Sequence, residues 1–61
     1  LLPDSAVIQT NFGTTCWELG LRREAARAYQ RVLELEPKHP DRALMTARIK
    51  RSTVEVEDEQ E

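Results

Sequence analysis

Two segments with the periodicity of an amphipathic α-helix, the first closed by a glycine and the second by a proline, cover most of residues 5–36. In the first segment the apolar residues recur every three or four positions and form one stripe, which consists of Ile8, Phe12, Cys16 and Leu19. Glycine accepts the left-handed conformation of a helix C-terminus at low cost. The pattern therefore predicts a helix over residues 5–19 that ends at Gly20, with Asp4 or Ser5 as its N-cap.

The second segment predicts a helix over residues 22–36. Its apolar stripe consists of Ala25, Ala26, Tyr29, Val32 and Leu33. Pro37 cannot continue the helix, and it pushes the preceding residue out of the helical region. Because so short a connection separates the two helices, they should be antiparallel neighbours in a helical hairpin.

A third, shorter helix is predicted over residues 41–51. Proline is tolerated in the first turn of a helix, so Pro40 and Asp41 suit its start. One face of this helix carries Ala43, Leu44 and Ala47, and another carries Met45 and Ile49. The acidic residues that follow Ser52 form no apolar stripe, and residues 53–61 are predicted to be a solvated, disordered tail. The expected fold class is therefore all-α, with one domain over residues 1–52.

Composition argues against an enzyme and against a metal site. The only cysteine, Cys16, excludes an internal disulfide, and His39 is the one other soft ligand, too few for a four-ligand zinc site. No Ser, His and acid at a triad spacing and no glycine-rich phosphate loop occur. We expect no catalytic, cofactor-binding or metal-binding residues: Cys16 should be a small core residue, and His39 a solvated loop residue.

Charge and hydropathy restrict the partners. The 61 residues carry a net charge of −2, which makes no basic field for nucleic acid. No apolar run reaches the length of about 18 residues that indicates a membrane span. We expect an intracellular, cytoplasmic chain that contacts neither nucleic acid nor membrane. Its first residues read as the middle of a longer protein.

The spacing of the small and aromatic residues resembles the tetratricopeptide repeat (TPR) family. The matching positions are Gln9, Phe12, Gly13 and Cys16 in the first helix, Ala25 and Tyr29 in the second, and Pro37 at the end. The repeat would run over residues 6–39, which fits the family's length of about 34 residues. Gln9 and Cys16 depart from the family's Trp and Tyr and reduce the apolar surface towards an N-terminal neighbour. Gly13 and Ala25 are read as the point where the two helices approach closely.

The resemblance implies a protein–protein interaction scaffold in which residues 40–51 are the capping helix of a C-terminal repeat. Its partner would be a protein or peptide, and self-association into a homodimer is compatible with it. The resemblance places a set of residues on or near the concave, partner-binding side: Val7, Thr10, Asn11, Thr14, Trp17 and Glu18. Trp17 has two readings there, as a packing residue or as a contact for the partner.

A small helix-turn-helix DNA-binding module is the alternative. Gly20 would lie in its turn, and four arginines follow in the next helix: Arg22, Arg23, Arg27 and Arg31. Against this alternative, the chain is net acidic, and Glu34 and Glu36 continue the same helix.

Overall fold

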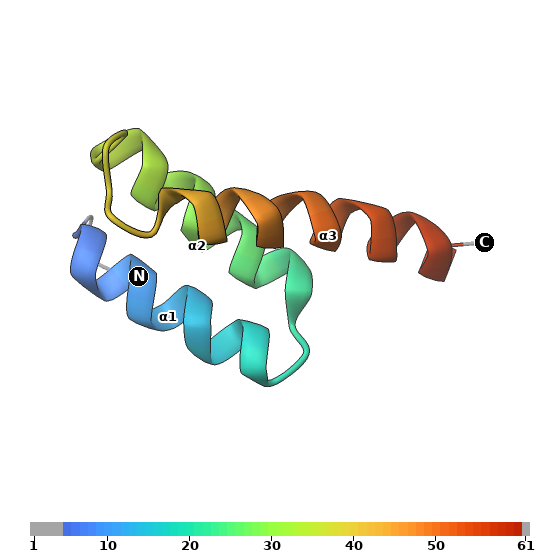
Figure 1. Ribbon diagram of the computed structural model, residues 1–61. Helices are drawn as coiled ribbons and strands as arrows, with labels where there is room; N and C mark the ends of the chain where they lie inside the picture. Colours follow the sequence, from blue (N-terminus) through green and yellow to red (C-terminus); the bar gives the residue numbers. More distant parts are fainter. Residues whose placement is uncertain (1–4, 61) are drawn as a thin grey trace.

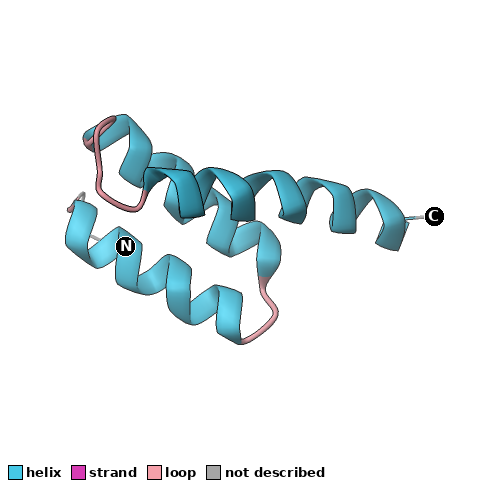
Figure 2. Cartoon of the chain, viewed as in Figure 1, coloured by secondary structure: helices cyan, strands magenta, loops and turns pink. Residues whose placement is uncertain are grey.

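The computed structural model describes the backbone of residues 5–60 and the side chains of residues 5–53. It contains three helices, α1 (Ala6–Glu18), α2 (Arg22–Leu35) and α3 (Arg42–Gln60), and no strand in the part of the chain that it describes (Figures 1 and 2). The predicted all-α fold and the hairpin of the first two helices are confirmed. Asp4, one of the two predicted N-caps, lies outside the described residues. Ser5 occupies the N-cap position with an extended backbone but makes no side-chain cap hydrogen bond.

A glycine turn joins α1 to α2. Gly20 has a φ of 84°, in the left-handed region. Its N–H donates to the carbonyl of Trp17 at 3.1 Å, and the N–H of Leu21 donates to the carbonyl of Cys16 at 2.8 Å. This pair of hydrogen bonds is the Schellman motif, which satisfies the last carbonyls of a helix. The chain therefore reverses within a few residues, and α2 runs back antiparallel to α1 (Figure 1).

The second helix forms the centre of the molecule, because it packs against both α1 and α3. Its buried residues are Ala25, Ala28, Tyr29 and Val32. Three of these belong to the predicted stripe, and the stripe's other members, Ala26 and Leu33, are half-buried. The periodicity of α2 therefore identified its inner face correctly.

The predicted core stripe of α1 is wrong except at Cys16. Cys16 is 3% exposed, whereas Ile8 and Phe12 are each 38% exposed and Leu19 is 69% exposed. The face that meets α2 instead contains the small residues Gly13 and Cys16. At about 100° per residue, the three exposed apolar side chains lie to one side of that line. Small residues let the two backbones approach, and the larger apolar residues are left beside the contact.

The close approach of α2 to Gly13 exists, but its partner is not the predicted Ala25. A Cβ atom at Gly13 would lie 2.9 Å from Cε1 of Tyr29 and 3.2 Å from Cβ of Ala28. The ring of Tyr29, which is 1% exposed, thus occupies the space that a side chain at residue 13 would need. Ala25 is part of the core cluster that also contains Cys16.

The third helix is longer than predicted. It begins at Arg42 and continues to Gln60, past the expected end at residue 51 and through most of the expected disordered tail. No glycine or proline follows Pro40, and Glu and Gln have good helix propensity, so nothing in this sequence stops the helix. Figure 1 shows the end of α3 projecting beyond the hairpin.

Of the two apolar faces that the sequence gives this helix, α3 turns the one with Met45 and Ile49 towards α2. Met45 and Ser52 are buried and Ile49 is half-buried, whereas Ala43, Leu44 and Ala47 are exposed. The buried positions follow the i, i+4, i+7 spacing of one helix face.

Candidate interaction surfaces

The residues predicted to bind a partner lie along α1 and divide into two groups. Val7, Asn11 and Glu18 are exposed, whereas Thr10, Thr14 and Trp17 are partly buried. Val7, Asn11, Thr14 and Glu18 share one edge of the helix, because they recur every three or four residues. Thr10 donates from its hydroxyl to the carbonyl of Ala6 at 2.6 Å. The structure therefore leaves only part of the predicted set open to a partner.

Trp17 connects all three helices. The guanidinium carbon of Arg22, at the start of α2, lies 4.4 Å from the centre of its ring, and that of Arg48, in α3, lies 5.1 Å from it. Both distances fit a cation–π interaction with the indole. Trp17 also packs against the core cluster. Of the two interpretations of Trp17, its contacts within the chain support the one in which it is a packing residue.

Tyr29 sits at the centre of a polar network between α1 and α3. Its hydroxyl shares a hydrogen bond of 3.0 Å with the hydroxyl of Thr14 and accepts one of 2.7 Å from Nη1 of Arg48. The buried hydroxyl is thereby satisfied. The sequence interpretation did not identify Arg48 as part of this network. Its spacing of three residues from Met45 and four from Ser52 was the signal that could have placed it on the inner face of α3.

Ser52 anchors the other end of the contact between α2 and α3. Its hydroxyl is buried and donates to the carbonyl of Arg22 at 2.8 Å. This carbonyl belongs to the first turn of α2, so the bond holds the middle of α3 against the start of α2. Together with Arg48, it defines the side of the hairpin that α3 covers.

The surroundings of Cys16 and His39 are explained by contacts within the chain. Burial, and secondarily the negative charge of Glu24, raise the pKa of the Cys16 thiol above its ordinary value. A thiol held in its neutral form is a poor nucleophile. The Nδ1 of His39 accepts a hydrogen bond of 3.0 Å from the N–H of Asp41, in the turn before α3. Among the described residues, no group of three or more His, Cys, Asp or Glu side chains could hold a metal ion.

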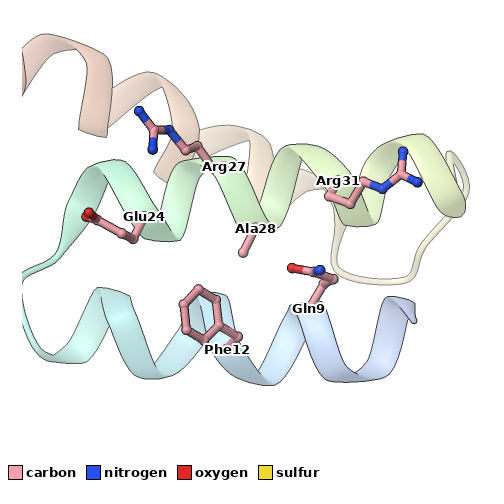
Figure 3. Close-up of a pocket in the computed structure, with 6 residues that line it drawn as sticks. All are labelled: Gln9, Phe12, Glu24, Arg27, Ala28 and Arg31. Carbon is pink, nitrogen blue, oxygen red and sulfur yellow. The ribbon is translucent and has the colours of Figure 1, made fainter. Parts of the chain in front are cut away.

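A groove lies between α1 and α2. It has a volume of about 340 Å³, and its lining residues are Gln9, Phe12, Glu24, Arg27, Ala28 and Arg31 (Figure 3). Trp17 and Tyr29, which contact Arg48 of α3, do not line it. In Figure 3, α3 lies behind α2, and Gln9, Phe12 and Ala28 lie in the space between α1 and α2. The groove therefore opens on the side of the hairpin that α3 leaves uncovered.

Exposed apolar side chains extend this groove along both helices. By helix periodicity, Ile8 and Leu19 lie on the same side of α1 as Phe12, and Leu35 lies on the same face of α2 as Ala28. All but Ala28 are exposed. The sequence interpretation assigned the α1 residues to the chain's own core and so missed this surface. One signal in the sequence could have indicated this surface. Beside its apolar stripe, α2 carries polar residues that line the groove, above all Glu24 and Arg31.

No helix in the described part of the chain is both long enough and apolar enough to cross a membrane.

No protein-family model, curated protein or solved structure matches this chain.

Proposed function

We propose that the chain is a protein–protein interaction module of the TPR kind, with residues 6–39 as the repeat and α3 as its capping helix. The observation that carries the proposal is the asymmetry of the hairpin. One side is covered by α3 through Met45 and Ser52, and the other exposes Ile8 and Phe12. Repeats in a solenoid bury such faces against their neighbours, and a polar helix covers the last one.

The proposed partners are proteins or peptides, in the intracellular, cytoplasmic setting that the sequence led us to expect. The exposed edge of α1 that carries Val7, Asn11 and Glu18 is the proposed peptide-contacting side. Thr10, Thr14 and Trp17 support this edge from within, since they bond or pack inside the chain. The proposed activity is binding, without a catalytic step.

The DNA-binding alternative has weaker support. Two of its four arginines are engaged within the chain, because Arg22 stacks on Trp17 and Arg31 pairs with Glu34 at 2.9 Å. The helix that would read DNA is also the central helix of the fold.

A designed fusion tests the proposal. A consensus TPR joined in front of Leu1 should dock on the face of the hairpin that exposes Ile8 and Phe12, which we call the open face. The two parts should then unfold together. We expect a gain of about 2 kcal/mol or more in the free energy of unfolding of residues 5–53, since full burial of one large apolar side chain contributes about 1.5–3 kcal/mol. Urea denaturation followed by circular dichroism measures the gain.

Two matched variants define the docking face in that fusion. Phe12→Glu should abolish the gain, because a carboxylate would be buried at the interface. Leu44→Glu should preserve it, because Leu44 lies on α3 and is already 50% exposed. Independent unfolding of the two parts, or equal effects of the two variants, would show that the hairpin does not stack as a repeat.

A further inference from the structure

The α2 side of the open groove carries charges in a self-complementary order. Glu24, Ala28, Arg31 and Leu35 recur every three or four residues and share one helix face. Figure 3 shows Glu24 and Arg31 at opposite ends of the groove, with Ala28 between them. A negative group therefore lies two helical turns from a positive one, on either side of a small residue.

We propose that a second copy of this chain docks on this groove across a twofold axis, with the two α2 helices antiparallel. An axis that passes between Arg27 and Ala28 places Glu24 of each copy opposite Arg31 of the other. A twofold interface repeats every contact, so the pairing forms twice. This inference rests on the proposed function, in which the face with the groove binds a partner. It identifies that partner as a second copy of the chain.

The apolar residues around the groove follow the same symmetry. The axis that pairs Glu24 with Arg31 places Leu35 opposite residue 20 of the other copy, within the turn between Leu19 and Leu21. All three leucines are exposed in the isolated chain. Ala28, beside the axis, is buried against Gly13 of α1 and forms the floor of the groove. The dimer would cover apolar surface at its ends.

The existing ion pair of Arg31 does not oppose this arrangement. Arg31 pairs with Glu34 of its own helix, but the two side chains remain 42% and 67% exposed. An exposed pair of this kind contributes little to stability, so its exchange for a contact with Glu24 of the second copy costs little. Phe12 lies next to this contact and is desolvated with it.

Sedimentation equilibrium of the full 61-residue chain tests the pairing. We expect the parent chain to form a concentration-dependent dimer. Glu24→Arg and Arg31→Glu should each weaken the dimer at least about tenfold, because each change places like charges opposite one another twice. Circular dichroism verifies that each variant remains helical.

Two rescue experiments identify the antiparallel register. The double variant Glu24→Arg/Arg31→Glu should dimerise again, because it restores both charge pairs in reversed order. A mixture of the two single variants should form a heterodimer, since every Arg then meets a Glu. Arg23→Glu is the matched control, because Arg23 is exposed on a different face of α2, and it should leave the dimer unchanged.

The outcomes separate this inference from the proposed function. A parent chain that is monomeric up to millimolar concentration, or a dimer that neither rescue restores, overturns the second copy as occupant. If the consensus-repeat fusion still gains stability in that case, the interaction function stands and only the dimer is lost. If the fusion gains nothing while the charge variants behave as expected, the repeat function falls and the dimer stands.

Discussion

Tyr29 is the residue on which the contacts of the three helices converge. Its ring lies against Gly13 of α1, and its hydroxyl bonds to Thr14 and to Arg48 of α3. These bonds hold the ring in place, so it cannot swing away from residue 13 without loss of a buried hydrogen bond. The glycine in the middle of α1 is therefore required by the position of one aromatic ring.

Replacement of Gly13 by leucine should destabilise the chain by at least about 1–3 kcal/mol, because even the Cβ atom would lie 2.9 Å from the Tyr29 ring. Urea denaturation of the purified variant measures the change in unfolding free energy. Gly13→Ala is less informative, since its better helix propensity of about 1 kcal/mol offsets the clash. Thr15→Leu, at an exposed position of the same helix, is the control and should be nearly neutral. Equal stability of Gly13→Leu and the parent would refute the close contact.

At the scale of the element, the described side chains of α3, up to residue 53, pack through a single face. Met45 and Ser52 are buried on it, and Arg48 reaches from it to both Tyr29 and Trp17. The next face of the same helix, which contains Leu44, remains in solvent. Two apolar neighbours in the sequence thus have opposite environments.

This contrast predicts different costs for two truncations. Met45→Ala should lower the free energy of unfolding by about 2–5 kcal/mol, because it removes a side chain that is 1% exposed from the core. Leu44→Ala should change it by less than about 0.5 kcal/mol. Thermal unfolding of both variants, followed at 222 nm in the same buffer, makes the comparison. A larger loss for Leu44→Ala would mean that α3 docks through its alanine-rich face instead.

At the scale of the whole molecule, charge is unevenly distributed along the chain. All the lysines and arginines precede Ser52, whereas residues 54–61 carry five acidic residues and no basic one. The arginines of α2 do not form a uniform basic surface, since Arg22 stacks on Trp17 and the carboxylate of Glu34 lies beside Arg31. Together these features disfavour tracking of a phosphate backbone.

The chain should therefore show no binding to duplex DNA at about micromolar concentration in physiological salt. Fluorescence anisotropy with a labelled duplex measures this at several salt concentrations. A salt-sensitive complex that disappears in the double variant Arg23→Glu/Arg27→Glu would favour the DNA-binding alternative. Loss of the same complex in Lys38→Glu alone would indicate nonspecific charge attraction instead.

The sequence by itself determined where α1 and α2 begin and end and which face of α2 is buried. These features depend on local chemistry: Gly20 adopts the left-handed conformation, Pro37 cannot extend a helix, and the apolar period of α2 has one inner face. Only the tertiary structure decided which residues of α1 and α3 are buried. Ile8 and Phe12 are apolar, as core residues are, but no other part of the described chain covers them and both remain exposed.

The candidate groove depends on tertiary structure for the same reason. Phe12 lines it because α3 packs on the far side of α2, and no local pattern states which side a third helix will choose. Likewise, Arg48 bonds to Tyr29 only because the packing of α3 on α2 brings these two residues to the same position along the helix axis. Helix ends follow from the conformational preferences of a few adjacent residues, whereas burial depends on which surfaces, distant in the sequence, exclude water from one another.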